Sequence, residues 1–338
     1  MRTPLRRGDF SFRFNASRSR VPRFTYMGAG AKIPVLDRWL EITSKSTRYI
    51  DLTAGSNNQP YLIAQTHKIP VATNDGSYYS YCISTGLFQR TRATDCGAVL
   101  EALIQAASRP KSHLADQYKI STPEVRQFVD AWVEVIHKYF GPGDREFILA
   151  CTGSALLKCC TFRAGRWLES GILTGQRTLT PPMLANAIFR SCVQRNPLRC
   201  SVEATSSHDT AGNFVKKYRK FKDATVSFDP AWPYADDTRN PYHVYHELGE
   251  ILKGEATPAY IWENSVEQVL GDIKTWVGTC LRKGAREVCL WNQTTNKPSK
   301  EDLIEAMRQD FKVDVILEVE HLKRNSTEKF LDYVLRMT

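Results

Sequence analysis

Short apolar runs that end in polar turns recur near the start of the chain and predict strands followed by helices. Residues 49–52 read Tyr-Ile-Asp-Leu, and a turn of Thr-Ala-Gly-Ser-Asn separates them from a helix that begins near residue 60. Residues 69–75 form a second short strand ending in Asn-Asp, before a helix over residues 78–87. This alternation is typical of a doubly wound α/β sheet.

The same alternation returns near the end of the chain. Residues 226–229 predict a strand, residues 265–281 a helix, residues 286–292 a strand, residues 300–308 a helix and residues 313–320 a strand. We therefore expect one sheet built from both ends of the sequence.

The middle of the chain has helical periodicity over residues 94–160, where apolar residues recur three and four positions apart. Thr122 and Pro123 predict the start of a central helix, since they suit the N-cap and first helical positions. Residues 161–223 lack this periodicity and are polar, rich in glycine and basic. Their arginines lie among aromatic residues and are Arg163, Arg166, Arg177, Arg190, Arg195 and Arg199. Basic residues interleaved with aromatics are typical of a nucleic-acid surface, although a solvated connector would also have this composition.

Charge is segregated along the 338 residues, whose formal net charge is +10. Residues 1–48 and residues 161–222 each carry eleven Lys and Arg against three acids, so the rest of the chain has a net charge of −6. Two basic regions on an acidic body indicate a polyanionic partner. Residues 1–24 resemble a basic arm that could lie along phosphates, or an organelle transit peptide.

Targeting and redox signals favour the cytoplasm. No apolar run is long enough to span a bilayer, and no secretory signal pattern is present. The nine cysteines form no CxxC pair, which suggests buried, reduced thiols. His243 and His246 have a spacing that a metal could use, but no further ligands accompany them, so we expect no zinc site.

Three stretches carry candidate cofactor chemistry. Asp51 ends a strand before Ala54 and Gly55, in a turn that could hold a nucleoside cofactor at the strand ends, although it is not GxGxxG. Asp75 follows about twenty residues later, a spacing that suits a carboxylate accepting ribose hydroxyls or a helix N-cap. Upstream, a small-residue loop opens a helix whose start favours anionic groups; its candidate residues are Tyr26, Gly30 and Lys32.

The stretch Asp229-Pro-Ala-Trp predicts a strand that ends at a carboxylate with a flat aromatic beyond it. Asp229 and the Pro230 carbonyl could hold an amino group while Trp232 stacks on a base. A strand followed by a structural turn is the alternative. Lys216, Lys217, Arg219 and Lys220 lead into this strand and are candidate phosphate contacts.

Taken in order, these motifs resemble the Dam-like, class-alpha adenine-specific DNA methyltransferases. Residues 30–37 are similar to the family's N-terminal cofactor motif, residues 51–56 to its Gly-containing turn, and residues 229–232 to its Asp-Pro-Pro-aromatic motif. The resemblance implies a Rossmann-like methyltransferase sheet from residues 25–93 and 224–338. It also implies an inserted, mostly helical and basic target-recognition subdomain over residues 94–223.

The resemblance also implies a cofactor, a partner and roles for these residues. S-adenosylmethionine would be the cofactor, with Asp75 on its ribose and Lys32, Ala54 and Gly55 along its methionine part. Double-stranded DNA would be the partner, with the target adenine flipped out of the duplex in a bacterial or virus-infected cytoplasm. Ala231 stands where the family has a second proline. An inactive DNA-binding relative is therefore an alternative. An RNA adenine methyltransferase is another, since the same chemistry suits exposed adenines in single strands.

Overall fold

A computed structural model gives the structure of the chain. It describes residues 21–25, 35–89, 93–160, 162–163, 166–167, 178–200, 202–230, 232, 242–257, 265–294, 296–322 and 329–338. The chain divides into two compact units. The sheet unit comprises Lys32–Gly76, Val202–Asn240 and Tyr260–Thr338, and the helical unit comprises Met1–Ala31, Ser77–Ser201 and Pro241–Ala259.

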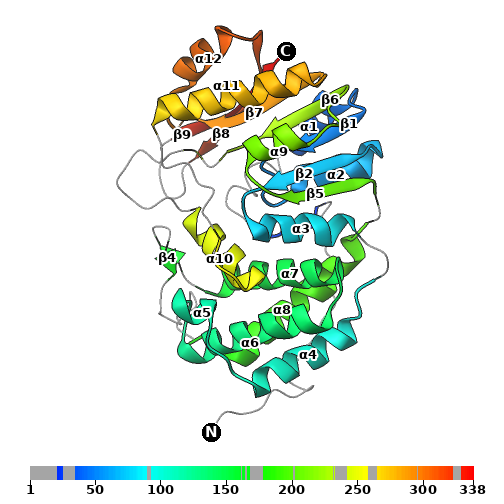
Figure 1. Cartoon of the computed structure of the whole chain (residues 1–338), viewed down its shortest axis with the longest axis vertical. Helices are drawn as coiled ribbons and strands as arrows, with labels where there is room; N and C mark the ends of the chain where they lie inside the picture. Colours follow the sequence, from blue (N-terminus) through cyan, green and yellow to red (C-terminus); the bar gives the residue numbers. More distant parts are fainter. Residues whose placement is uncertain are drawn as a thin grey trace. The chain divides into compact units, whose positions relative to one another are not determined.

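The sheet unit contains one sheet, which has seven strands in the described part of the chain, in the order β5-β2-β1-β6-β7-β9-β8 (Figure 1). The strands are β1 (Arg48–Asp51), β2 (Val71–Asp75), β5 (Ala204–His208), β6 (Ala224–Phe228), β7 (Glu287–Gln293), β8 (Val313–Leu322) and β9 (Lys329–Met337). Neighbours from β5 to β7 pair in parallel, whereas β9 is antiparallel to both β7 and β8. The fold is therefore α/β with a mixed, mostly parallel sheet, compatible with the Rossmann-like prediction.

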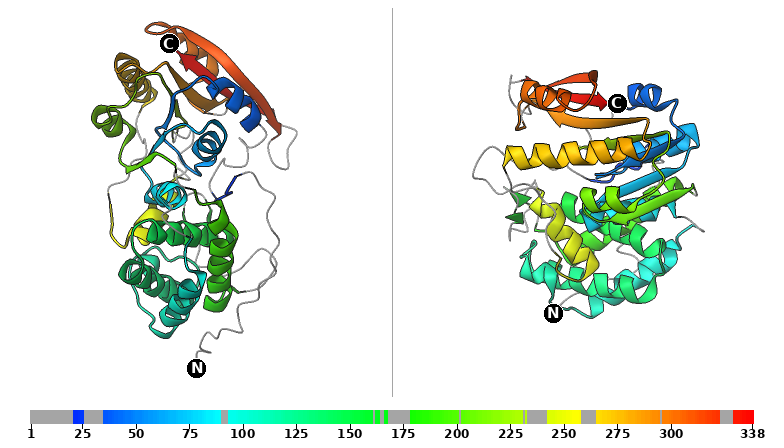
Figure 2. Two further views of the ribbon diagram at one scale, coloured as in Figure 1. Left: turned by 90° about the vertical axis from the view of Figure 1, so that its right-hand side faces the viewer. Right: turned by 45° about the horizontal axis from the view of Figure 1, so that its top comes forward.

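Helices cover both faces of this sheet, as the left view of Figure 2 shows, with α1 and α2 on one face and α9 and α11 on the other. The helices of the unit are α1 (Leu36–Thr43), α2 (Asn58–His67), α9 (Ala211–Lys217), α11 (Val266–Arg282) and α12 (Lys300–Arg308). Successive strand residues point to opposite faces. Ile50 accordingly joins the hydrophobic cluster that includes Ile273 of α11, whereas Tyr49 packs against Trp39 of α1 with ring centroids 6.4 Å apart.

The helical unit is built mainly from α3 (Tyr78–Phe88), α4 (Cys96–Ser108), α5 (Leu114–Gln117), α6 (Pro123–Tyr139), α7 (Asp144–Cys159), α8 (Pro181–Arg195) and α10 (His243–Lys253). A 3₁₀ turn (Asn196–Leu198) and a short hairpin of β3 (Phe162–Arg163) and β4 (Arg166–Trp167) complete its described elements. Thr122 caps α6 as expected, because its hydroxyl accepts the Val125 N–H.

Helices α3 and α7 pack closely because glycine stands at two of their contacts. A Cβ at Gly86 would lie 2.5 Å from the Cα of Phe147, and a Cβ at Gly153 would lie 2.5 Å from the ring of Tyr79. Real Cβ atoms do not approach other atoms so closely, so the spacing of these helices depends on the absence of side chains there.

The boundaries of the predicted insert differ from the structure. β5 and α9, which lie within residues 94–223, belong to the sheet unit, whereas α3 and α10 belong to the helical unit. The region without periodicity also contains a regular helix, α8, and β9 was not predicted. Residues 1–20 of the expected basic arm lie outside the described residues, but Val21 and Phe24 are buried, so the arm does not extend to residue 24 as a free segment.

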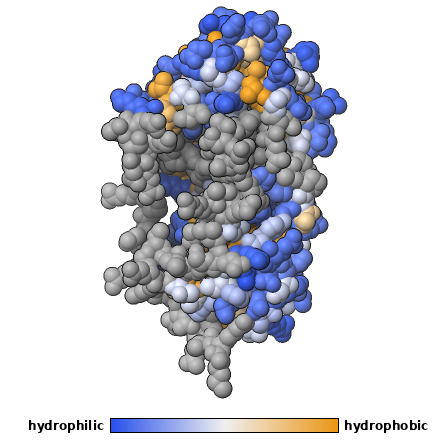
Figure 3. Space-filling model, turned by 90° about the vertical axis from the view of Figure 1, so that its left-hand side faces the viewer, coloured by the Kyte–Doolittle hydropathy of each residue, from blue (hydrophilic) through white to orange (hydrophobic). Residues whose placement is uncertain are grey.

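Apolar side chains are scattered on the described surface. The large hydrophobic residues exposed there are Tyr139, Met183 and Val315. The face in Figure 3 accordingly has mostly hydrophilic described residues with small hydrophobic groups between them. Among the described helices, none combines the length and the apolar character that crossing a membrane requires.

Candidate functional site

Four neighbouring parallel strands of the sheet unit end at aspartates. Asp51 and Asp75 are the last residues of β1 and β2, while Asp209 and Asp229 directly follow β5 and β6. The chain leaves β1 toward β2 on one side of the sheet, and leaves β6 toward β7 on the other. β1 and β6 therefore flank the switch point where open α/β sheets bind ligands. The topology therefore brings the three acids that were predicted from the sequence, Asp51, Asp75 and Asp229, to the carboxyl ends of adjacent strands, an edge of the sheet where ligands bind.

The turn after β1 is held by hydrogen bonds to its own acid and to β2. Asp51 is buried, and its Oδ1 accepts the Thr53 N–H at 3.2 Å. The Ala54 N–H donates to the Asn74 carbonyl at 3.0 Å. Gly55 has a φ of +51°, a left-handed conformation that glycine adopts without strain.

Asp75 is joined directly to this turn. Its Oδ2 accepts the Gly55 N–H at 2.9 Å, and the residue is 9% exposed. A carboxylate has about four lone-pair positions, so this bond is compatible with further donors. His208, its register partner on β5, bonds through Nε2 to the Gly76 carbonyl at 3.1 Å. Asp75 is thus fixed from the glycine turn, and its following residue is fixed from β5.

Asn74 holds three strand ends together and was treated in the sequence only as part of the Asn-Asp pair. Its Nδ2 donates to the Leu52 carbonyl at 3.1 Å and to the Asp209 carbonyl at 3.0 Å. Asn74 is 1% exposed, so these bonds lie within the sheet edge. An asparagine immediately before the acid at a strand end was the available signal.

Thr53 holds the backbone of Asp229 at the point where the chain leaves β6. The Asp229 N–H donates to Thr53 Oγ1 at 2.6 Å, and Pro230 follows as a buried residue. Trp232 is 3% exposed and belongs to the hydrophobic cluster of the sheet unit. Its ring is therefore not open to solvent, as a ring waiting to stack on a base would be.

Asp209 is an acid that the motif analysis did not select. Burial opposes its ionisation, but hydrogen bonds from Lys217, 2.6 Å away, and from Asn213 leave the pKa of Asp209 below its ordinary value. The carboxylate is therefore ionised and locally compensated by Lys217. Its place after a strand rich in Ser and Thr gave little apolar signal in the sequence.

Asn58 offers a polar group without a partner near the glycine turn. It is the first residue of α2 and is 5% exposed, yet neither amide atom bonds to a described residue. A buried amide without a partner costs free energy, and a polar ligand would remove that cost. Asn58 is thus an additional candidate for ligand binding.

The basic segment at the end of α9 is anchored from the residue that follows α11. Lys283, which follows that helix, donates from Nζ to the carbonyls of Val215, Lys216 and Tyr218 at 2.5–2.9 Å. These bonds cap the α9 C-terminus. Of the four predicted phosphate contacts, Lys217 and Lys220 lie near acids, with Nζ–oxygen distances of 2.6 Å to Asp209 and 3.7 Å to Glu203.

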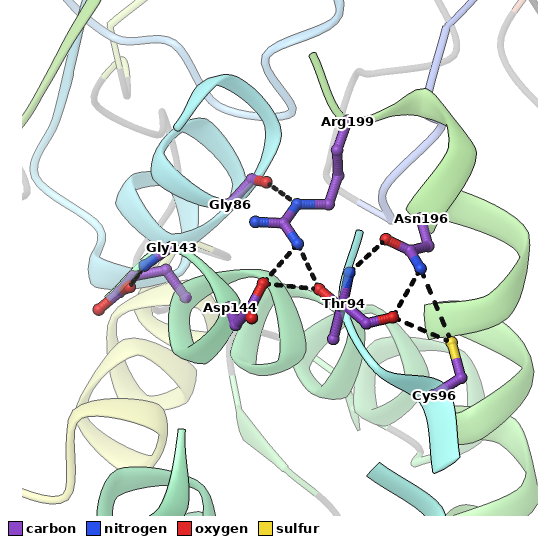
Figure 4. Close-up of polar contacts among 8 residues, drawn as sticks. Gly86, Thr94, Cys96, Gly143, Asp144, Asn196 and Arg199 are labelled. Carbon is purple, nitrogen blue, oxygen red and sulfur yellow. Dashed lines mark hydrogen bonds and ion pairs between the residues drawn. The ribbon is translucent and has the colours of Figure 1, made fainter. Parts of the chain in front are cut away.

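Two arginines predicted for a nucleic-acid surface are instead buried. Arg199 is 3% exposed, and its guanidinium bonds to the Gly86 carbonyl, Thr94 and Asp144, as Figure 4 shows. Arg195 is 6% exposed, and its Nε and Nη2 donate to the carbonyls of Pro22 and Arg23 at 3.0 and 2.8 Å. Neither side chain is available for phosphates, because both are buried and bonded within the protein. The prediction was wrong because a sequence pattern shows the charges but not their burial.

Several predicted residues lie outside the described part of the chain. These residues are Tyr26, Gly30, Lys32, Arg177 and Ala231. For Arg163 and Arg166 only the backbone is described, and the two are register partners in the β3–β4 hairpin.

No family model matches the sequence, and no curated protein matches it either. The case for a function therefore rests on the residues themselves.

Proposed function

We propose that the protein transfers a methyl group from S-adenosylmethionine to the exocyclic amino group of adenine in double-stranded DNA. The observation that carries the proposal is the presence of Asp75, Asp51 and Asp229 at the ends of the adjacent strands β2, β1 and β6. The ends of β1 and β6 flank the switch point, and the glycine turn after β1 is bonded to Asp75 at the end of β2.

The donor set suits this cofactor. Carboxylates at the sheet edge favour a ligand that carries positive charge, as a sulfonium compound does. Asp75 would accept ribose hydroxyls, Ala54 and Gly55 would border the methionine part, and Asn58 at the start of α2 would meet its polar end. The antiparallel β9 beside β7 departs from the six-strand dinucleotide-binding order, and the turn lacks GxGxxG.

When bound, S-adenosylmethionine supplies a methyl group on a sulfonium sulfur that is open to direct displacement. The Asp229 carboxylate and the Pro230 carbonyl would accept hydrogen bonds from the adenine amino group and direct its lone pair toward that methyl group. Trp232 would stack on the flipped base after moving from its buried position. Orientation and preorganised electrostatics would provide most of the rate enhancement.

Transfer of labelled methyl groups to mixed-sequence duplex DNA tests the proposal. Asp229→Asn keeps the shape of the side chain but removes its charge, and Asp229→Ala removes the acceptors. We expect both variants to lose transfer by on the order of 10²–10³-fold, with cofactor binding nearly unchanged. Normal turnover in either variant would remove Asp229 from the active site.

The buried ring of Trp232 favours one second candidate, a methyltransferase-like protein that binds DNA without modifying it. Ala231 in place of a proline also supports this candidate. Retained duplex binding without methyl transfer by the wild-type protein would establish it. Competition between duplex DNA and RNA in the same assay separates the DNA methyltransferase from an RNA enzyme.

A further inference from the structure

The hydrogen bond between Asp229 and Thr53 ends the ladder between β1 and β6. The last regular bond runs from the Leu52 N–H to the Ser227 carbonyl at 2.9 Å. In a parallel ladder the Asp229 N–H would next donate to the Leu52 carbonyl. That carbonyl instead accepts the Asn74 side chain, and the Asp229 N–H donates to Thr53 Oγ1 at 2.6 Å.

This change of hydrogen-bond partner helps to fix the backbone of Asp229, which is restrained at its N–H and by the proline that follows it. Thr53 holds its N–H, and Pro230 restricts its ψ because the proline ring excludes the helical region for the preceding residue. Pro230 has a fixed φ of its own. The backbone of Asp229, and with it the Cα–Cβ bond that leads to the carboxylate, is therefore held relative to the turn after β1.

Thr53 also orders the turn after β1, which is the turn proposed to bind the cofactor. The Thr53 N–H donates to Asp51 Oδ1 at 3.2 Å, two residues before the Gly55 N–H bonds to Asp75. Thr53 thus connects the proposed cofactor turn with the strand end proposed to hold the adenine amino group. The two are 176 residues apart in the sequence.

We propose that Thr53 is a positioning residue that aligns Asp229 and the Pro230 carbonyl with the cofactor turn, an inference that rests on the proposed methyl transfer. Thr53 acts through Asp229 and does not itself take part in the reaction. Alignment errors of about 1 Å between reactants cost about 10²-fold in rate. The hydroxyl oxygen is the atom that matters.

Two substitutions separate the hydroxyl from the shape of the side chain. Thr53→Val keeps the shape but lacks the acceptor, and we expect its kcat to fall about 10- to 100-fold while KM for the cofactor and affinity for duplex DNA change less than about threefold. Thr53→Ser keeps the acceptor and should retain most of the activity. A merely structural role would not produce this division between kcat and KM.

Thr47→Val is a matched control at the other end of the same strand pair. Its hydroxyl donates to the Asp223 carbonyl at 3.1 Å, so this variant also removes a threonine bond to the backbone before β6. We expect its kcat to equal that of the wild type. An equal loss in Thr47→Val and Thr53→Val would assign the effect to general destabilisation and overturn the proposal.

Amide hydrogen exchange at Asp229, monitored by nuclear magnetic resonance, measures the bond from the Asp229 N–H to Thr53 independently of activity. Protection should be lost in Thr53→Val and kept in Thr53→Ser. Loss of protection with unchanged kcat would overturn the positioning role, as would unchanged protection. A wild-type protein that transfers no methyl group would instead refute the proposed function, and that failure is visible before any variant is made.

Discussion

At the scale of single residues, the strand ends are organised by side chains that bond to backbone groups. The Asn74 side chain donates to the Leu52 carbonyl, and the Thr53 hydroxyl accepts the Asp229 N–H, two backbone groups that do not pair with each other in the ladder. The Asp75 carboxylate accepts the Gly55 N–H. Buried backbone groups need such partners. The carboxylates of Asp51 and Asp75 and the backbone of Asp229 are therefore held in place before any ligand arrives, which reduces the entropy lost on binding.

Asp75→Asn tests the residue proposed to bind ribose. The amide oxygen can still accept the Gly55 N–H, but the charge is lost and one oxygen becomes a donor. Hydrogen bonds to charged groups contribute about 1.5–3 kcal/mol, so we expect the cofactor Kd to rise about 10- to 100-fold. Isothermal titration calorimetry measures it. An unchanged Kd would place the ribose elsewhere.

Glu203→Gln is a control for Asp75→Asn at the same sheet. Its carboxylate lies on the surface before β5, 3.2 Å from Arg48. This change removes one negative charge from the sheet unit without touching the glycine turn. The cofactor Kd should remain that of the wild type.

Sequence reasoning found the acids but not the residues that hold them. Asp51, Asp75 and Asp229 each follow an apolar run, a local signal. Thr53 and Asn74 bond to groups that are 176 and 135 residues away, which no local pattern contains. Arg195 and Arg199 were expected on the surface, because the charge of an arginine does not reveal that backbone carbonyls satisfy it internally.

At the scale of elements, long periodic helices and acid-ended strands were predictable, and the parts between them were not. α8 lies in the region without helical periodicity and begins with Pro181-Pro182, although proline suits the first turn of a helix. β5 is an edge strand with the sequence Ala-Thr-Ser-Ser-His and partly exposed residues, so it lacks an apolar face. Tertiary pairing with β2, not local pattern, makes it a strand.

Gly86→Ala tests the close contact of α3 and α7. The new methyl group would meet the backbone of Phe147 at 2.5 Å, and backbone cannot rotate away as a side chain can. Overpacking of this kind costs about 1–3 kcal/mol, more than alanine gains over glycine in a helix. We expect the free energy of unfolding, measured with urea, to fall.

Gly271→Ala is the matched control, since Gly271 lies within α11 and a Cβ there meets nothing within 4 Å. Alanine should stabilise that helix by up to about 1 kcal/mol. Opposite signs for the two variants are the expected result. A stabilised Gly86→Ala protein would show that the two helices can separate without cost.

At the scale of the whole molecule, an acidic edge of the sheet coexists with a net charge of +10. The basic residues that remain available to a polyanion are fewer than the sequence suggests, because Arg195 and Arg199 are buried and Lys217 and Lys220 lie near acids. Lys216 and Arg219 are exposed, and their side chains form no hydrogen bond or ion pair with described residues.

This difference predicts which part of the basic segment governs DNA binding. Each phosphate contact contributes about 0.9 to the slope of log K against log salt concentration. Replacing both Lys216 and Arg219 by Gln should weaken binding to any duplex sequence and reduce the magnitude of that slope by about 2. Replacing both Lys217 and Lys220 by Gln removes the same formal charge but should change the slope less, because Asp209 and Glu203 already offset those lysines. Fluorescence anisotropy with a labelled duplex across a salt series measures both slopes. Equal effects of the two double variants would show that total charge governs binding, and an unchanged slope in both would exclude this segment from the interface.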